Sequence, residues 1–470
     1  MKVQLPETIA DCHELIKRLV EITDALVLRV EKLEQENKAL KERLDNNSSN
    51  SSKPPSQDFK KKKTKKKANS NKGGGVKGHQ GHFRELLPVD EVDAVVSCKL
   101  PKRCICGEKR IKSQDVLRHQ VYELPPIKLN ITEYQLEKGT CVCCGKKRLA
   151  TLPNGITWGI TGPRLTSFMA HMLSKYKLSR RGLQSFLSEQ LSFPLSMGCI
   201  YKKQRLVSDA LKEPVADLLN QVKISHSAHM DETGHRRDGV NQWLWGVMSK
   251  SAAFFSVETS RGKKVIDSLM GDFDGILVSD RYAGYNYFPS DKRQICWAHL
   301  KRDFTKLSEK QDKPITRIGS ELLNCQADLF ELWHQHKLGS FSRWELIRKT
   351  QCIRHKVGEL LEQGTYTDPK LRIVRFCSNL LTHFDALWTF IFNENIEPTN
   401  NHAEQCLRPA VIWRKNYFGT RSDYGSDFVA RTMSLITSCR LQAKNAFDVC
   451  SQILMDHFSG KKSLVFANHQ

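Results

Sequence analysis

Three acidic residues, far apart in the chain, occur in contexts that suit a metal-dependent reaction. Asp280 ends an apolar run that begins at Gly275, which is typical of a buried strand that delivers an acid to its C-terminal edge. Asp231 lies in the segment AHMDETG, and Glu404 lies in the segment TNNHAE. Three carboxylates that met would repel one another unless a divalent cation lay between them. Mg2+ or Mn2+ held in this way is what two-metal phosphoryl transfer needs.

Each acid also has a purely structural explanation. Asp231 and Asp280 could cap the turn or helix that follows their strands. Glu404 follows Asn401 by three residues, close to the spacing of a capping box, so its carboxylate could satisfy a backbone amide. Both explanations stay open for each acid taken singly, whereas the three acids together with the order of the strands favour catalysis.

The segments around Asp231 and Asp280 predict a mixed α/β core. We expect a strand that ends at Asp280, a helix over 262–270, and other strands over 224–231, 243–248, 252–257 and 294–298. The order β-β-β-α-β-α-β resembles a ribonuclease-H-like core, in which the first and fourth strands are neighbours. Asp231 and Asp280 would then face each other across the sheet, and a helix packed beside them could bring in Glu404.

The long separation of Asp280 from Glu404 predicts a helical insertion inside this core. The intervening segment is too long for a simple crossover, and apolar residues recur in it at helical spacing. We place the insertion at about 305–395 in a catalytic domain over 221–470. The preceding helical region, 160–220, is either a helix-turn-helix that contacts DNA or an ordinary support for the core.

Residues 5–45 carry a heptad repeat that is typical of a coiled coil. One core position of the heptad holds a leucine every seven residues, at Leu19, Leu26, Leu33 and Leu40. The other core position holds the polar Asn37, and a polar residue there fixes the register of a two-stranded coiled coil. We expect this segment to make the protein a homodimer or a larger oligomer. The alternative is an amphipathic helix that packs on its own chain.

A basic segment of low complexity follows at 46–78. Asn, Ser, Pro and Lys replace the hydrophobic periodicity there, so the segment cannot bury enough surface to offset chain entropy, and we expect a disordered linker. Its lysines either follow DNA phosphates without sequence preference or only keep a spacer solvated; they are Lys60, Lys61, Lys62, Lys63, Lys65, Lys66 and Lys67. The formal net charge of +23 exceeds what this run supplies, which favours a polyanionic partner.

Two cysteine clusters mark a small module at 79–152. The second cluster contains a C-x-x-C knuckle followed by glycine, while the first has one residue between its cysteines. Four thiolates could close a tetrahedral structural Zn2+ site, namely those of Cys104, Cys106, Cys141 and Cys144. The alternatives are free buried thiols or a site that has lost its metal. Alternation within 115–137 predicts strands of a small ribbon between the clusters.

Composition bounds the setting of the protein. A chain of 470 residues has room for two or three domains. It contains 15 cysteines, an odd number, and we find neither a signal peptide nor an apolar run of transmembrane length. These features favour reduced thiols in the cytoplasm and exclude a membrane partner from our expectations.

Several segments are similar to the insertion sequence 66 family of bacterial transposases. They lie in one order along nearly the whole chain: NSSNSSKPPS at 47–56, MDETG at 230–234 with WLW at 243–245, VSDRYAGY at 278–285, AHLKR at 298–302 and NNHAEQCLRP at 400–409. Because several separate motifs agree, the resemblance is specific.

The resemblance implies an Asp-Asp-Glu transposase that binds the ends of its element and target DNA, and that cuts and joins DNA strands with Mg2+. Asp231, Asp280 and Glu404 match the catalytic acids of the family. It also implies a zinc-finger-like module, from which the spacing of Cys104 and Cys106 departs, and small accessory proteins of the same element as partners. Such a protein would be associated with the nucleoid. Basic residues near Glu404 could line a DNA channel, namely Arg408, Arg414, Lys415 and Arg421.

Two other functions remain open at this point. A dimeric DNA-binding protein without catalysis would have no use for the acid triplet. A ribonuclease-H-like nuclease would use the same acids but would cut DNA without joining strands, and a strand-transfer assay separates these outcomes.

Overall fold

The computed structural model describes residues 8–45, 47, 50, 84–109, 115–366 and 371–466. The chain divides into two compact units, one over Lys61–Ile131 and one that combines Met1–Lys60 with Thr132–Gln470. The seven lysines predicted to follow DNA phosphates lie outside the described residues, as does most of the predicted linker.

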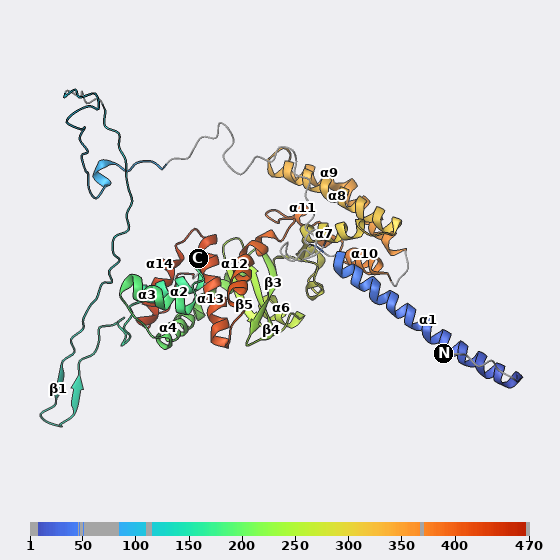
Figure 1. The fold of residues 1–470 in the computed structure, drawn as a ribbon, viewed down its shortest axis with the longest axis horizontal. Helices are drawn as coiled ribbons and strands as arrows, with labels where there is room; N and C mark the ends of the chain where they lie inside the picture. The colour runs from blue at the N-terminus through green and yellow to red at the C-terminus, as the bar shows by residue number, and fades with distance from the viewer. Residues whose placement is uncertain are drawn as a thin grey trace. The chain divides into compact units, whose positions relative to one another are not determined.

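A five-stranded mixed sheet forms the centre of the larger unit (Figure 1). Its strands are β3 (Ser227–Arg237), β4 (Val240–Met248), β5 (Ala253–Glu258), β6 (Ile276–Ser279) and β7 (Arg293–Ile295). In space they are ordered β5-β4-β3-β6-β7. The first three strands are antiparallel neighbours, while β6 is parallel to β3 and β7 is parallel to β6. The mixed α/β architecture expected from the sequence is therefore confirmed.

The first strand differs from its prediction at both ends. It begins at Ser227 because Ile224 still belongs to the end of helix α5 (Lys212–Lys223). It continues to Arg237 because β4 pairs with it along its whole second half, beyond the hydrophobic part of the segment. The tight turn between them is made by Asp238 and Gly239, both with positive φ, as a two-residue hairpin requires.

The crossover from β6 to β7 contains no α-helix, so the second helix of the predicted order is wrong. Two short 3-10 turns occupy the crossover, Ala283–Tyr285 and Ser290–Lys292. Gly284 and Pro289 interrupt this short segment, and both residues disfavour a helix interior. The predicted last strand is also shorter than expected, because its final residues begin helix α7 (Trp297–Ser308).

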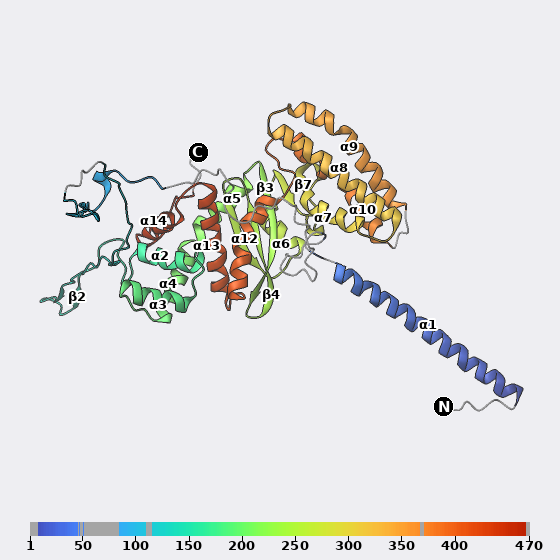
Figure 2. The same ribbon diagram turned by 45° about the horizontal axis from the view of Figure 1, so that its top comes forward.

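Helices pack against the strands of this sheet (Figure 2). The helical region that precedes the sheet has the elements expected there, followed by α5: α2 (Pro163–Ser174), α3 (Arg180–Leu191) and α4 (Met197–Ala210). The chain ends with α12 (Asn401–Tyr417), α13 (Asp423–Leu441) and α14 (Ala446–Phe458), while α6 (Lys263–Met270) connects β5 to β6.

Helix α13 closes the free edge of the sheet with serine side chains. The backbone N–H of Phe255 donates to Ser434 Oγ at 2.9 Å. The N–H of Ala253 donates to Ser438 Oγ at 2.9 Å, and that hydroxyl donates back to the Ala253 carbonyl at 3.1 Å. Edge strands with unpaired backbone groups invite pairing with other chains, so these contacts protect β5.

A helical insertion follows β7, as the length of the intervening segment predicted. It consists of α7, α8 (Lys313–Lys337), α9 (Arg343–Thr365), α10 (Arg372–Thr382) and α11 (Thr389–Phe392). Its apolar core includes Leu322, Leu361 and Trp388, and continues without a break into Val278 and Ile295 of the sheet. The insertion is therefore packed on the β6–β7 end of the sheet.

The N-terminal segment is one long helix, α1 (Ile9–Asp45). Its predicted core leucines are half exposed, with 53% of Leu19, 59% of Leu26 and 53% of Leu33 accessible to solvent. A helix that forms a coiled coil with another chain would expose such a row of apolar residues when it is alone. The coiled coil itself stays a prediction. Within the described part of the chain, no helix has the length and apolar character needed to cross a membrane.

The predicted ribbon between the cysteine clusters is absent from the described residues of that segment. Strands occur instead on either side of the second cluster, where β1 (Lys138–Thr140) pairs with β2 (Lys147–Leu149) in an antiparallel hairpin. The described residues 115–137 form no strand. Alternating side chains alone do not make a strand where no neighbouring strand supplies hydrogen bonds.

Candidate active site

Asp231 of β3 and Asp280, the residue directly after β6, lie at equivalent positions along neighbouring segments. The parallel pairing of β3 with β6 aligns His229 with Val278, and each aspartate lies two residues further along its chain. Asp231 Oδ1 accepts the backbone N–H of Glu232 at 2.9 Å. Asp280 Oδ1 accepts the N–H of Tyr282 at 2.8 Å. Asp280 therefore binds the turn that follows β6, as the capping explanation predicted for it, whereas the bond of Asp231 lies within β3, which continues to Arg237.

Asp231 is in an unfavourable environment for a negative charge. Burial raises the pKa of its carboxyl well above the usual range, and the negative charges of Glu232, Asp280 and Glu404 raise it further. The three predicted acids thus interact electrostatically although they come from distant parts of the chain. A cation placed among them would relieve this repulsion.

Glu404 approaches the site from the first turn of α12. Its Oε1 lies 3.2 Å from Arg302 Nη2 and 3.6 Å from His299 Nε2, both of helix α7. Asn400 occupies the N-cap position and makes no side-chain capping bond. The described contacts of Glu404 are therefore with cationic and histidine side chains, and the predicted capping box is not formed.

Asn400 joins the start of α12 to the strand that carries Asp231. Its fully buried side chain donates from Nδ2 to the Met230 carbonyl at 2.9 Å, and its Oδ1 lies 3.0 Å from His229 Nδ1. Burial lowers the pKa of His229 to about 4, so the ring is neutral near pH 7, and Nδ1 must carry the proton because the amide oxygen only accepts. The backbone N–H of Asn400 also reaches Cys296 Sγ at 3.1 Å.

A second acid beside Asp231 is buried in its own network. The Glu232 side chain is only 3% exposed and forms an ion pair with Arg261, while Tyr285 Oη donates to it at 3.4 Å. The Arg261 guanidinium also lies 4.1 Å from the ring centre of Tyr282. Burial raises the pKa of Glu232, and the charge of Arg261 opposes that shift. Sequence reasoning missed this network, although the adjacent acids Asp231 and Glu232 were a visible signal.

A buried arginine positions the loop that follows β6. Arg293, fully buried in β7, donates from Nη2 to the Asp280 carbonyl at 2.9 Å and from Nη1 to Asn286 Oδ1 at 3.0 Å. Its Nε donates to Ser279 Oγ at 3.2 Å. The Asp280 carbonyl and the side chains of Ser279 and Asn286 are thereby held from the next strand. No sequence pattern distinguishes such an arginine from one exposed to solvent.

The donor set suits a hard divalent cation, but its three members are not assembled around one point. All three predicted ligands offer carboxylate oxygens, which Mg2+ prefers. Among the described residues, no group of three or more His, Cys, Asp or Glu side chains is close enough to hold a metal ion. Glu404 is engaged by Arg302 instead. Asp231 and Asp280 carry the oxygens that a cation would need, and Glu404 would join them only after exchanging its partner.

The basic residues predicted near Glu404 divide into two groups. Arg414 donates to the Gly234 carbonyl at 2.7 Å and to Thr233 Oγ1 at 3.2 Å, so it fastens α12 to β3. The other three are exposed to solvent: Arg408, Lys415 and Arg421. Contact with DNA stays a prediction for all four.

The two cysteine clusters form similar tight turns in different compact units. Gly107 and Gly145 follow the clusters with φ of +92° and +67°, a conformation that favours glycine. Backbone hydrogen bonds from Cys106 lower the pKa of the Cys104 thiol, and those from Cys144 and Cys143 lower that of Cys141. Stabilised thiolates suit metal binding. Because the clusters fall in different units, the four-cysteine zinc site stays a prediction.

Comparison with known proteins gives two matches to families. Residues 159–427 match the family described as "Transposase IS66 family", and residues 3–85 match a family of unknown function. The uncharacterized protein y4qI of Sinorhizobium fredii (strain NBRC 101917 / NGR234) is 23% identical over 419 residues, which cover 80% of this chain and 73% of that protein. The uncharacterized protein y4hP of the same strain is 24% identical over 403 residues, covering 76% of this chain and 71% of that protein.

Proposed function

This chain belongs to the IS66 family of transposases, and from that premise we propose that it cuts the DNA at the ends of its element and joins those ends to target DNA. Membership of the family indicates a DNA-processing enzyme that binds DNA. The finer proposal assigns catalysis to Asp231, Asp280 and Glu404. The fold would then be a ribonuclease-H-like core interrupted by a helical insertion.

One observation carries this proposal. Asp231 lies two residues beyond the last β3–β6 pair in β3, and Asp280 lies two residues beyond the same pair, directly after β6. Asn400 connects β3 to the helix that bears Glu404. The strand order β5-β4-β3-β6-β7 agrees with the first and fourth strands being neighbours, as a ribonuclease-H-like core requires. The raised pKa of Asp231 adds that the negative charges are close enough to affect one another.

The reaction consists of two in-line displacements at phosphorus. In the first, water attacks a phosphodiester, the P–O3′ bond breaks, and the products are a 3′-hydroxyl and a 5′-phosphate. In the second, that 3′-hydroxyl attacks a phosphodiester of the target, so that one strand is joined as another is broken. Transposases of the Asp-Asp-Glu type typically use a divalent metal, which makes the attacking oxygen a better nucleophile and stabilises the leaving oxygen.

The chain's own residues supply position and charge for these displacements. Asp231 and Asp280 would hold the cation, because both follow the last β3–β6 pair by two residues and the charge of Asp280 acts on Asp231. Glu404 would complete the ligand set when it exchanges Arg302 for the cation. Arg302 would then be left beside the reacting phosphate with its positive charge, where charge develops during displacement.

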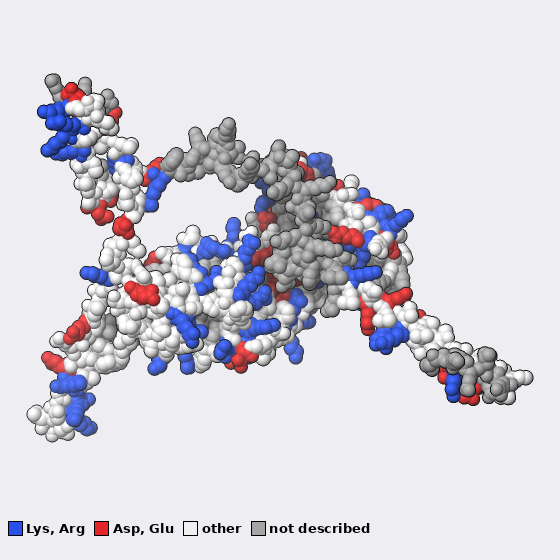
Figure 3. All heavy atoms as spheres, viewed as in Figure 1, with Lys and Arg blue, Asp and Glu red and all other residues white. Residues whose placement is uncertain are grey.

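Surface charge supports a DNA partner for this site. Figure 3 shows lysine and arginine side chains spread over the face of the molecule in view, with acidic side chains among them. The exposed cations of α12 and its following turn include Arg408, Lys415 and Arg421. The lysine run, a dimer through α1, a zinc-binding cysteine module and small accessory proteins of the element are further parts of the proposal.

Asp280→Asn tests the assignment directly. We expect the variant to lose metal-dependent cleavage of DNA that carries the inverted repeats flanking the gene, while its affinity for that DNA stays within about twofold of the wild type. The matched control is Asp274→Asn, which changes an exposed acid shortly before the same strand. Undiminished cleavage by Asp280→Asn would refute the site. Cleavage by the wild type without any joined product would favour a nuclease.

A further inference from the structure

The helical insertion and the loop after Asp280 together border an open, arginine-lined hollow. It has a volume of about 330 Å³, and its lining consists of Arg281, Arg372, Arg375 and Phe376. Arg281 directly follows the predicted catalytic Asp280 in the chain. Arg372 and Arg375 are three residues apart on α10, so they project from one side of that helix. We call these residues the arginine hollow.

The inner wall of the arginine hollow is fixed by packing. Arg281 forms an ion pair with Asp303 of α7 at 3.2 Å, and its guanidinium lies 4.9 Å from the ring centre of Phe376. Phe376 in turn makes an edge contact with Phe304 of α7, at 6.2 Å between ring centres. Helix α7 also carries Arg302, which contacts Glu404. One helix therefore supports both the third acid and the hollow.

The outer wall of the arginine hollow faces solvent. Arg372 and Arg375 are exposed, and the sequence of α10 contains no acidic residue. Two guanidinium groups on one helix side create a local positive potential next to the predicted cleavage site. The buried side of α10 is formed by other residues, namely Ile373, Cys377 and Leu380.

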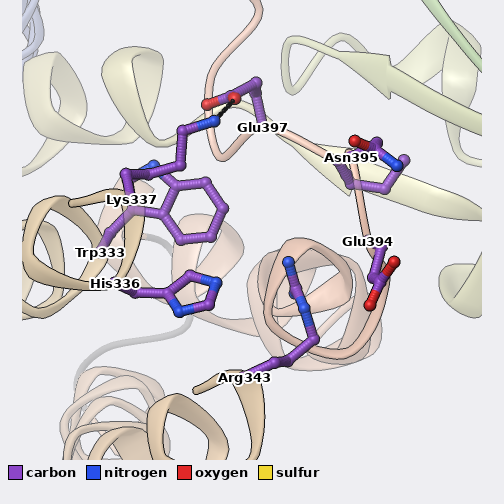
Figure 4. A pocket seen from close by; sticks show the side chains of 8 residues that line it. Trp333, His336, Lys337, Arg343, Glu394, Asn395 and Glu397 are labelled. Atoms are coloured by element: carbon purple, nitrogen blue, oxygen red, sulfur yellow. Dashed lines mark hydrogen bonds and ion pairs between the residues drawn. The ribbon is translucent and has the colours of Figure 1, made fainter. Parts of the chain in front are cut away.

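A second hollow in the insertion is also lined by cationic side chains. It has a volume of about 320 Å³ and lies between α8, α9 and the segment after α11 (Figure 4). Lys337 Nζ binds Glu397 Oε1 at 2.7 Å, and Arg343 donates to the carbonyls of Phe390 and Ile391 at 2.8 Å each. None of its lining residues is next to a predicted catalytic acid in the chain, so this hollow carries no ligand argument.

We infer that the arginine hollow binds phosphodiester groups of the DNA strand next to the bond that is cut. The inference rests on the proposed function, which places the cut at Asp231 and Asp280. Guanidinium groups match phosphate oxygens with paired hydrogen bonds and keep their charge at all relevant pH values. Contacts of this kind set the position of DNA without reading its sequence. The insertion thereby becomes part of the DNA-binding surface.

The test compares two doubly substituted proteins in the full chain. Arg372→Gln with Arg375→Gln removes the two exposed charges of the hollow. Arg348→Gln with Lys349→Gln removes two exposed charges from α9, elsewhere on the same insertion. Binding of a fluorescent DNA duplex of arbitrary sequence is measured between about 50 and 200 mM salt. Arg372→Lys with Arg375→Lys keeps the charges and serves as the folding reference.

Each result has a stated meaning. We expect the slope of log affinity against log salt to become shallower by about two for the Gln pair in the hollow, since each lost phosphate contact reduces it by about one. The Lys pair should keep the wild-type slope, and the α9 pair should change it by less. An unchanged slope for the hollow pair, or an equal change for both Gln pairs, overturns the inference. The slope needs no cleavage, so failure of the catalytic proposal would be seen separately in the Asp280→Asn assay.

Discussion

The two strand acids and the helix acid are held by different kinds of contact. Asp231 lies within β3 and Asp280 directly follows β6, and each binds the backbone after it, so backbone contacts hold both. Glu404 contacts the side chains of Arg302 and His299, and 38% of its own side chain is exposed. Backbone contacts within a sheet change little when a ligand arrives, whereas an exposed ion pair can be exchanged. Two thirds of the proposed ligand set is therefore preformed and one third is adjustable.

The largest expected effect comes from removing a preformed acid. Asp231→Asn should reduce cleavage by about three orders of magnitude, equivalent to about 4 kcal/mol of barrier, because a cation would lose a fixed ligand. A gel assay of cleavage on the element's DNA measures this loss. The control is Asp272→Asn, an exposed acid. If Glu404→Gln were far more damaging than Asp231→Asn, the adjustable acid would be the dominant one.

Asp231→Asn should lower activity, but it should raise the stability of the metal-free protein at neutral pH. Burial and neighbouring acids raise the pKa of Asp231 in the folded protein, so its ionised form costs stability as pH rises through that raised pKa. Below the pKa of the unfolded chain both states are protonated and the cost is absent. The metal-free Asp231→Asn protein should thus melt higher than the wild type at neutral pH and equally at acid pH. A lower midpoint at neutral pH would contradict the crowding of charges.

An intermediate effect is expected at Asn400, which joins the strand of Asp231 to the helix of Glu404. Asn400→Ala leaves the Met230 carbonyl and His229 Nδ1 without their buried partner. Each unsatisfied group costs about 1–3 kcal/mol, which chemical denaturation would measure as a lower free energy of unfolding. We also expect cleavage at saturating DNA to fall about tenfold with unchanged DNA affinity. The neighbouring exposed Asn401→Ala is the control, and a fall in cleavage no larger than the unfolded fraction would show that Asn400 only stabilises the fold.

The smallest expected effect concerns the ion pair of the adjustable acid. Arg302→Gln should tighten binding of Mn2+, measured by calorimetry without DNA, by up to about fivefold, because a partly exposed ion pair contributes at most about 1 kcal/mol. Lys301→Gln removes a neighbouring exposed charge of α7 and serves as the control. Weaker binding by Arg302→Gln would mean that the arginine holds Glu404 in place for the metal instead of competing with it.

Sequence reasoning located the acids but not the groups that surround them. Apolar runs and turn residues marked the strands of Asp231 and Asp280, because burial and backbone geometry act over a few neighbouring residues. The length of the separation from Glu404 correctly predicted the helical insertion. The contact of Glu404 with Arg302 joins residues 102 positions apart, so no local pattern contains it. The polar end of β3 was missed for the same reason, since pairing with β4 and not hydrophobicity extends that strand.

The sequence also did not predict which polar side chains are buried. Arg293 and Glu232 belong to residue types that are usually exposed, and only their partners in the fold explain their burial. The arginine hollow likewise combines Arg281 with residues of α10 that lie about ninety positions later in the chain. Local sequence predicts which helices and strands form, whereas the tertiary fold determines which charged side chains come into contact.

The serine contacts of α13 with β5 have a consequence for synthesis of the protein. Ser438 completes the edge strand although it lies 185 residues after Ala253. At about 5–20 residues per second, a ribosome needs roughly ten to forty seconds to make that stretch. If the sheet forms during this interval, the edge strand β5 is not yet covered by α13. It can then pair with a strand of a neighbouring nascent chain. Rare codons in that stretch should therefore increase aggregation during expression, and slower initiation, which spaces the ribosomes, should reduce it.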